Sequence, residues 1–406
     1  MASLDPAVLL ALVRSGQLAT FESLPALVAG CAERARLHGA RLFVADLQQA
    51  VLREVTGRGD DAGQGGQELG IDSTAAGRAF RSSETVSVPV RTGLRHWVPI
   101  VHGIERLGLL RVDTGSDTDP GDGAGLVDVA ALLGLLLLAK RTGSDSYARL
   151  TRTRPMSVAA EMQRGLIPPT MFANHRVVIA AVSEPAYESA GDAFDYALAG
   201  DTVHLALFDA MGHDTAAGFT AGLAVAALRN QRRQGATLIQ SCEAIEAVLL
   251  EQFARTCYTT AVLADLDMRT GQLTWVTCGH PPPVLIRGGR WPVPLVGPRS
   301  HPLGTDLGLP VTVCREQLEP GDRVLLYTDG ITEARDRAGQ PFGEERFADF
   351  VVRHQADGMP VTETLRRLVH AVLEHHDDKL QDDATVLLCE WHGNQALHPG
   401  QAPLGS

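Results

Sequence analysis

The sequence has few cysteines, and none of them lie in the close pairs that thiolate metal sites use. Its six cysteines are scattered along the chain, without a Cys-x-x-Cys motif. Zinc sites need such pairs, and disulfide-stabilised domains need a much higher cysteine content. We therefore expect neither a zinc site nor a disulfide framework. Separate, reduced thiols are typical of a cytoplasmic protein.

Clusters of positive charge and long apolar runs are missing as well. The formal net charge is −12, which disfavours nucleic acid or an anionic membrane as the main partner. The apolar segment Leu132–Ala139 is far shorter than the roughly 20 residues of a membrane-spanning helix. The first residues, MASLDPAVLLALVRSG, lack the basic leader of a secretory signal peptide. These features predict a cytoplasmic protein that binds neither nucleic acid nor membrane.

The length of the chain points to more than one domain. It has 406 residues, of which 45% are hydrophobic and 21% charged, a composition typical of folded globular proteins. A chain of this length exceeds one ordinary hydrophobic core, so we expect two domains and a linker.

The N-terminal part begins with alternating helix and strand patterns. Leu24–Leu37 has apolar residues at helical spacing, and Arg41–Leu47 and Ala50–Val55 have the pattern of two strands with a tight connection. The segment Gly57–Gly70 is rich in glycine but lacks the Lys and Ser/Thr of a phosphate-binding loop. We interpret it as a surface loop.

Two further strands and an apolar helix complete this part. The strands are expected at His96–Val101 and Leu107–Val112, and the helix at Leu126–Ala139. The stretch HWVPIVHGIERLGLLRVD resembles the closing half of a GAF sensor domain. The resemblance implies a GAF-like α/β sensor domain over residues 1–140.

Residues 141–169 have the features of a linker with a regulatory helix. Arg141–Arg154 is charged and rich in Ser and Thr, and Met156–Pro169 has a helical pattern that two prolines end. The last residues, 393–406, are rich in Gly, Pro and Gln and predict a disordered tail.

Residues 170–392 combine many short strands with a few long helices. The first two helices are expected at Thr215–Arg233 and Leu238–Phe253, and two more near Glu344–His354 and Val361–His376. Strands are expected at 177–182, 196–199, 203–208, 259–265, 274–278, 283–287, 311–315, 323–328 and 384–389. This pattern favours sheets that are flanked by helices.

Four aspartates in separate motifs carry the chemical information. Asp192 lies in AGDAFD, Asp209 in FDAMGHD, Asp329 in YTDGITE and Asp382 in QDDATV. Each is expected in a loop-like setting, and three adjoin predicted strands, whose ends can hold a carboxylate rigidly. A single Asp of this kind usually caps a turn. Four that converge would repel one another without a cation, and oxygen ligands select a hard ion such as Mg²⁺ or Mn²⁺.

These motifs carry a family resemblance. In order, AGDAFD, FDAMGHD, AGLAVAALRN, CGHPPPVLIR, LEPGDRVLLYTDGITEARDRAGQPFG and QDDATVLL resemble the SpoIIE-like branch of the metal-dependent protein phosphatase (PPM, type 2C) family. The resemblance implies an α+β protein whose phosphatase domain, residues 170–392, is an αββα sandwich. It also implies metal-dependent hydrolysis of phosphoserine or phosphothreonine.

The resemblance implies a centre of two Mn²⁺ or Mg²⁺ ions. Asp209 is expected to bridge both ions, and the carbonyl of Ala210 to bind the second. Asp329 and Asp382 are expected to complete the shell of the first. Asp192 is expected to reach the second directly or through water. Asp209 and Asp192 are the expected catalytic residues.

The sequence leaves open the roles of several residues near these expected ligands. The family usually has Gly where this chain has Ala210, so the backbone there must suit a residue with a Cβ. Met211 stands where eukaryotic relatives place a His, and His213 is either a substitute general acid or part of a turn. Asp195, the second acid of GDxxD, is either a metal contact or an orienting residue.

The resemblance also implies a partner. The expected substrate is a phosphorylated regulatory protein of the anti-anti-sigma type, and the sensor domain is expected to regulate its hydrolysis. The alternatives are a catalytically inactive module that sequesters the same protein and, less favoured, an enzyme for small phosphate esters or nucleotides. The apolar surface of Leu132–Leu138 predicts a homodimer.

Overall fold

The structure is a computed structural model. It describes residues 6–34, 37–91, 93–115, 123–184, 187–188, 191–212, 214–289, 292–298, 300–308, 310–336, 339–356, 359–375 and 382–393. The chain divides into two compact units, Met1–Pro155 and Met156–Ser406. The segment 141–169 is shared between them, because α5 (Asp145–Thr151) falls in the first unit and α6 (Val158–Leu166) in the second. His213 and residues 394–406 of the predicted tail lie outside the described residues.

The N-terminal unit is built on one antiparallel sheet with the strand order β3-β2-β1-β6-β5-β4. Its strands are β1 (His38–Ala45), β2 (Val51–Val55), β3 (Glu68–Gly70), β4 (Val86–Val90), β5 (Gly93–His102) and β6 (Glu105–Gly115). The four strands that the sequence predicts here are present. The prediction of a loop throughout 57–70 was wrong at its end, because β3 pairs there with β2.

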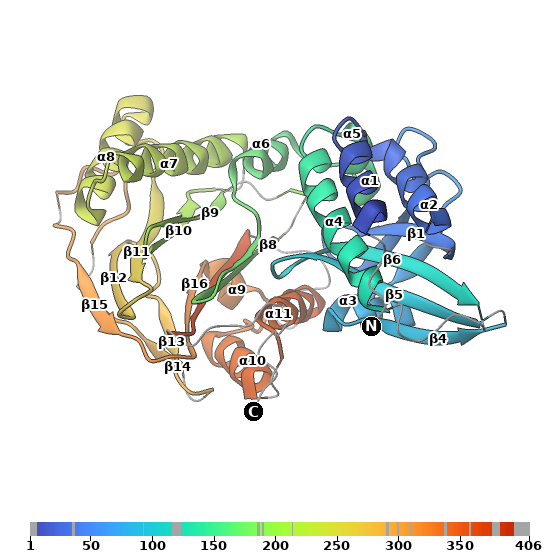
Figure 1. Cartoon of the computed structure of the whole chain (residues 1–406). Helices are drawn as coiled ribbons and strands as arrows, with labels where there is room; N and C mark the ends of the chain where they lie inside the picture. Colours follow the sequence, from blue (N-terminus) through green and yellow to red (C-terminus); the bar gives the residue numbers. More distant parts are fainter. Residues whose placement is uncertain are drawn as a thin grey trace. The chain divides into compact units, whose positions relative to one another are not determined.

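Helices cover both faces of this sheet (Figure 1). One face, which includes Leu42, Val98 and Leu110, contributes to a core with α1 (Pro6–Gly16), α2 (Leu24–Arg34) and α4 (Gly123–Arg141). The other face, which includes Phe43 and Trp97, packs with α3 (Ala75–Ser82). The alternation follows from the two-residue repeat of a strand. A short 3₁₀ turn, η1 (Phe21–Ser23), precedes α2.

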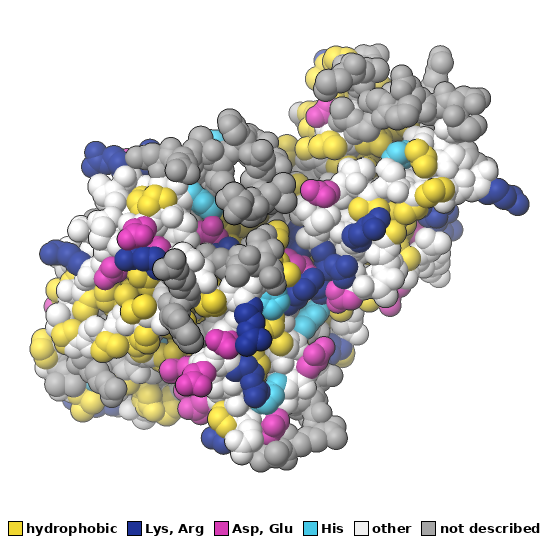
Figure 2. Space-filling model, turned by 90° about the horizontal axis from the view of Figure 1, so that it is seen from below, with side chains coloured by type: hydrophobic (Ala, Val, Ile, Leu, Met, Phe, Trp, Pro, Cys, Tyr) yellow, Lys and Arg dark blue, Asp and Glu magenta, His cyan; other side chains and the backbone are white. Residues whose placement is uncertain are grey.

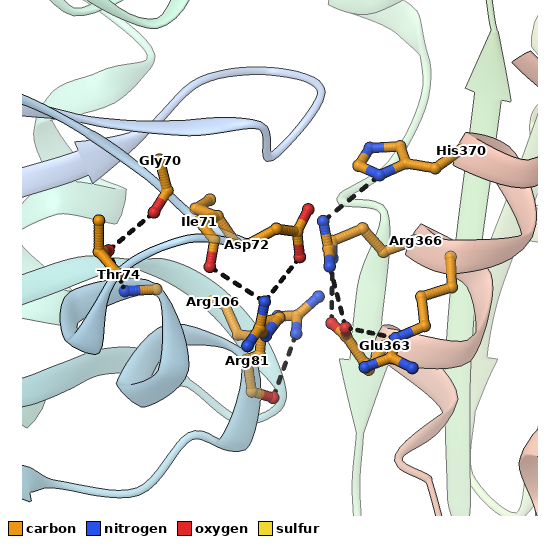
Figure 3. Close-up of polar contacts among 11 residues, drawn as sticks. Gly70, Ile71, Asp72, Thr74, Arg81, Arg106, Glu363, Arg366 and His370 are labelled. Atoms are coloured by element: carbon orange, nitrogen blue, oxygen red, sulfur yellow. Dashed lines mark hydrogen bonds and ion pairs between the residues drawn. The ribbon is translucent and has the colours of Figure 1, made fainter. Parts of the chain in front are cut away.

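Helix α3 and the turn before it are joined by polar contacts, several of which Figure 3 shows. The Thr74 hydroxyl accepts a hydrogen bond from the backbone N–H of Gly77 at 3.0 Å, which caps the helix. A Cβ at Gly77 would lie 1.8 Å from the Ile71 carbonyl oxygen, so the close approach requires glycine. At the other end, Arg81 donates to Asp72 at 2.7 Å.

Helix α4 buries more of its leucines within its own unit than the sequence suggests. Leu133 and Leu137 are buried, and Leu132, Leu136 and Leu138 pack against the same core. Leu135, in contrast, is 53% exposed, and the predicted homodimer stays a prediction. No helix among the described residues combines the length and apolar character needed to cross a membrane.

The C-terminal unit packs two antiparallel sheets face to face between helices (Figure 1). The first sheet has the order β15-β12-β11-β10-β9 and the second β14-β13-β16-β17-β8-β7. The strands are β7 (Met171–Ala173), β8 (Val177–Glu184), β9 (Asp192–Ala199), β10 (Thr202–Ala210), β11 (Thr259–Asp267), β12 (Gln272–Cys278), β13 (Val284–Ile286), β14 (Pro292–Pro294), β15 (Cys314–Gln317), β16 (Asp322–Tyr327) and β17 (Ala384–Trp391). The predicted αββα layering is confirmed.

The helices of this unit flank the two sheets. Helices α7 (Thr215–Arg233) and α8 (Leu238–Phe253) cover the first sheet, with the bounds that the sequence predicts. Helices α9 (Asp329–Glu333), α10 (Glu344–Ala356) and α11 (Val361–His375) lie with the second sheet. On α11, the buried Glu363 accepts hydrogen bonds from Arg366 at 3.0 Å and Arg367 at 3.0 Å (Figure 3).

The surface carries charges of both signs despite the net charge of −12. On the face shown in Figure 2, Lys and Arg side chains are interspersed with Asp, Glu and apolar side chains. Such mixed surfaces are usual for globular proteins.

Candidate metal centre

The candidate site lies where the inward-facing rows of both sheets change from apolar to polar. In β10, Leu205 and Leu207 face the core between the sheets, and the next residue on that face is Asp209. In the second sheet, Leu326 faces the same core and Thr328 continues its row. The same change occurs at the neighbouring strand ends, which contribute Asp192, Thr260, Asp383 and Thr385.

Asp192 and Asp209 stand directly opposite each other on β9 and β10. Like charges at such a pair destabilise a sheet. Burial, followed by the charges of Asp209 and Asp383, holds the pKa of Asp192 well above its ordinary value. Burial, followed by the charges of Asp329, Asp382 and Asp383, raises the pKa of Asp209 to about 7.

Asp329 and Asp382 approach the pair from the second sheet. Asp329 is the first residue of α9, and burial, followed by the charges of Glu333 and Asp382, raises its pKa. Asp382 is exposed in the segment before β17. The expectation that all four aspartates lie in loops was therefore wrong for three of them: Asp192 and Asp209 are strand residues and Asp329 is helical.

The backbone around Ala210 is crowded but suits a side chain. Ala210 ends β10 and is not among the residues with positive φ, so its Cβ causes no strain there. The turn that follows uses Gly212, whose φ is +90°. A Cβ at Gly191 would lie 3.0 Å from the Ala210 carbonyl oxygen and 2.5 Å from that of Gly212. The glycine of the AGD motif thus lets β9 begin against this turn.

Two contacts from the second sheet fix the start of β9. The Thr328 hydroxyl donates to Oδ2 of Asp192 at 2.7 Å and accepts from the backbone N–H of Thr385 at 2.9 Å. Oδ2 of Asp383 accepts hydrogen bonds from the backbone N–H groups of Gly191 at 2.6 Å and Asp192 at 3.3 Å. Asp192 is therefore oriented by both sheets.

Asp195 does not face this centre. It is three residues beyond Asp192, so its side chain leaves the opposite face of β9, toward α7. There it is 1% exposed and forms ion pairs of 2.7 Å with both Arg229 and Arg232. The metal-contact alternative for Asp195 does not fit this position, and the residue anchors α7 to the sheet instead.

The donor set fits a hard divalent cation in type and in charge. The four predicted aspartates supply oxygen only, and among the residues that the structure describes none of the four forms an ion pair with Lys or Arg. Ionising them together therefore requires a compensating positive charge. No three His, Cys, Asp or Glu side chains of the described ranges are gathered at metal-ligand distances. The aspartates lie near enough to shift one another's pKa values. Their described side chains are not close enough for three of them to contact one ion.

Sequence reasoning missed several residues that hold this arrangement. Asp383, Thr328 and Thr385 orient Asp192, and His280 joins the two sheets beside Thr260. The sequence pattern that could have identified the threonines is the alternation along each strand. Each threonine stands two residues from an apolar residue that faces the core.

Comparisons with known proteins find similarity over the C-terminal unit. Residues 199–392 match the model of the family described as Stage II sporulation protein E (SpoIIE). Phosphoserine phosphatase RsbU of Bacillus subtilis (strain 168) is 21% identical over 234 residues, 57% of this chain and 69% of RsbU. Protein IcfG of Synechocystis sp. is 24% identical over 258 residues, 56% of this chain but 40% of IcfG. The solved SiaA-PP2C domain of Pseudomonas aeruginosa is 21% identical, covers 57% of this chain and 93% of that domain, and has a TM-score of 0.49.

Proposed function

We propose that this chain, whose C-terminal unit is a SpoIIE-like, metal-dependent protein phosphatase domain of the PPM family, hydrolyses phosphoserine or phosphothreonine on a regulatory protein. The observation that carries the proposal is the buried pair of Asp192 and Asp209, directly opposite each other and close to further acids. A sheet that places carboxylates together in its core tolerates the repulsion if a cation is bound there.

Five groups would hold two Mn²⁺ or Mg²⁺ ions. Asp209 would bridge them, and Asp192 and the Ala210 carbonyl would serve one, while Asp329 and Asp382 would serve the other. Bound ions of this kind supply a nucleophilic water near neutral pH and neutralise the phosphoryl oxygens. Oxygen donors without sulfur or imidazole give Zn²⁺ no advantage.

The protein's own contribution is orientation and charge. Thr328 donates to Oδ2 of Asp192 and thereby orients that carboxyl group. Asp209, with a pKa raised to about 7, gives up its proton easily when a cation approaches near neutral pH. Both residues belong to the paired strands β9 and β10, so a bound phosphate would meet a preorganised site.

The substrate and its control belong to the same proposal. The similarity to RsbU, named a phosphoserine phosphatase, supports a phosphorylated protein of the anti-anti-sigma type as the substrate. The N-terminal sheet with helices on both faces supports a GAF-like sensor that regulates the hydrolysis. We also propose a homodimer in the cytoplasm, in which the exposed Leu135 of α4 takes part in the contact.

The test is phosphate release from phosphorylated anti-anti-sigma proteins of the same genome, with Mn²⁺ or Mg²⁺ and with EDTA. Release should need the metal and should fall by more than 100-fold in Asp209→Asn, since the bridging carboxylate is lost. Asp201→Asn is the matched control, because Asp201 is exposed in the turn at the far end of the β9–β10 hairpin.

Three results would overturn the proposal in different ways. Full turnover after chelation would exclude the metal mechanism. Tight binding of the phosphoprotein without release would favour the inactive sequestering module. Release from small phosphate esters but from none of the phosphoproteins would move the substrate to another class.

A further inference from the structure

Two hydrogen bonds in series join the sheets beside the aspartates. The Thr260 hydroxyl oxygen lies 2.6 Å from Nδ1 of His280, and Nε2 of His280 lies 3.0 Å from the carbonyl oxygen of Tyr327. A carbonyl oxygen only accepts, so Nε2 carries the proton and donates it. In a neutral ring Nδ1 is then an acceptor, and the Thr260 hydroxyl donates to it.

The imidazole is in the neutral form that this direction requires. His280 is 7% exposed, and burial lowers its pKa to about 4. Neither of its ring contacts is a carboxylate that would favour the charged form. The donor and acceptor of each bond are therefore the same throughout the neutral pH range.

Both ends of this link adjoin predicted metal ligands. Thr260 on β11 is the register partner of Asp209 on β10, so the two side chains lie next to each other on the inner face of the first sheet. Tyr327 is the last residue of β16 in the second sheet, two residues before Asp329. The ring of His280 thus spans from beside Asp209 to just before Asp329.

The backbone of the CGHPPP motif gives His280 little freedom. Gly279 has a φ of +69°, and a Cβ there would lie 2.6 Å from Cγ of Pro302, so the position requires glycine. The Gly279 N–H donates to the carbonyl oxygen of Ser300 at 3.1 Å. Three prolines, 281–283, follow the histidine and restrict its backbone further. The imidazole is held as a rigid spacer.

We propose that His280 and Thr260 are positioning residues that set the distance between Asp209 and Asp329 and thereby the affinity of the site for its divalent cation. The inference rests on the proposed function. The contacts of Thr328 and Asp383 fix the β9 side of the site, whereas the His280 link fixes the side of β11 and β16. Residues that orient metal ligands typically change metal affinity by about 10–100-fold when they are replaced.

The experiment measures Mn²⁺ binding to the full chain by calorimetry, together with phosphate release against Mn²⁺ concentration. Thr260→Val keeps the shape but removes the hydroxyl, and we expect about a 10-fold or larger rise in the Mn²⁺ dissociation constant. Thr260→Ser keeps the hydroxyl and should stay within about 3-fold of wild type. Thr274→Val is the matched control, because it also removes a hydroxyl bond, at 3.3 Å to the Asp265 carbonyl oxygen, elsewhere in the same sheet.

His280 variants separate the two halves of the link. His280→Asn can replace the contact at Nδ1 and His280→Gln the contact at Nε2, so each should lose one bond and weaken Mn²⁺ binding. Combining Thr260→Val with His280→Asn should cost less than the sum of the two single changes, because both break one link. Saturating Mn²⁺ should restore most of the turnover in Thr260→Val.

The outcomes distinguish the inference from the proposed function. Wild-type affinity in Thr260→Val, or equal losses in Thr260→Ser and Thr260→Val, would overturn the positioning role alone. Similar losses in Thr274→Val would show general destabilisation of the sheet and would also overturn it. A wild-type chain that binds no Mn²⁺ would overturn both. Thermal unfolding in EDTA checks that each variant is folded.

Discussion

Replacing Asp209 by Asn should stabilise the metal-free protein while it abolishes metal binding. The pKa of Asp209 is raised from 3.8 to about 7 by burial and by its acidic neighbours. The folded state therefore holds this proton up to about pH 7, whereas the unfolded chain releases it near pH 4. Between these values the folded state binds more protons, so stability falls as the pH rises.

The size of this effect follows from the pKa difference. At about 1.4 kcal/mol per unit, an ionised Asp209 costs the metal-free fold at most about 4 kcal/mol above pH 7, and relaxation reduces this to about 1–3 kcal/mol. The groups that face it are Asp192, Asp329, Asp382 and Asp383, all of them acids. An Asn keeps the shape without the charge, so it avoids the cost.

Calorimetric unfolding of the full chain in EDTA tests this reasoning. Wild type and Asp209→Asn should unfold at similar temperatures near pH 5. Near pH 8 the C-terminal transition of the variant should be higher by about 3–10 °C. Added Mn²⁺ should raise that transition temperature in wild type but not in the variant. This response identifies the transition as that of the C-terminal unit, and wild type should then be the more stable of the two proteins. A variant that is less stable than wild type in EDTA near pH 8 would refute the electrostatic argument.

Three further predictions concern other parts of the fold. Asp195→Asn should destabilise the C-terminal unit by about 3 kcal/mol in thermal unfolding and leave Mn²⁺ affinity unchanged by calorimetry, because the side chain pairs with two arginines on the far face. Gly330→Ala should weaken Mn²⁺ binding by at least about 10-fold, since a Cβ there would lie 1.9 Å from the Asp383 carbonyl oxygen. Leu137→Glu should unfold the N-terminal unit, whereas Leu135→Glu should leave it folded by circular dichroism and shift a dimer to monomer in sedimentation.

The sequence predicted the helices α7 and α8 well, because a helix is a local pattern, and the acidic motifs are recognisable from local sequence too. Helices α7 and α8 have apolar faces and clear caps, from Asp214 and Thr237, and their predicted bounds are those of the structure. Asp209 and Asp329 stood out because each follows a run of apolar strand residues. These signals need no knowledge of the packing.

The strand bounds and residue roles that we did not predict depend on contacts between segments far apart in the sequence. The predicted strand at 196–199 begins at Asp192 in the structure, because pairing with β10 extends it through Ala193. The edge strand predicted at 311–315 lies at Cys314–Gln317, where its register is set by β12. The role of Asp383 depends on N–H groups that lie about 190 residues away along the chain, and no local pattern reports such a partner.

The position of β17 has a consequence for protein synthesis. It is the last strand of the chain's C-terminal unit, yet it lies inside its sheet, between β16 and β8. Until the ribosome has released residues 384–391, β8 and β16 have no partner between them, and Asp382 and Asp383 are not in place. A nascent chain therefore lacks the complete set of aspartates until these residues have emerged. A premature stop codon anywhere before Ala384 would leave β8 and β16 without the strand that joins them.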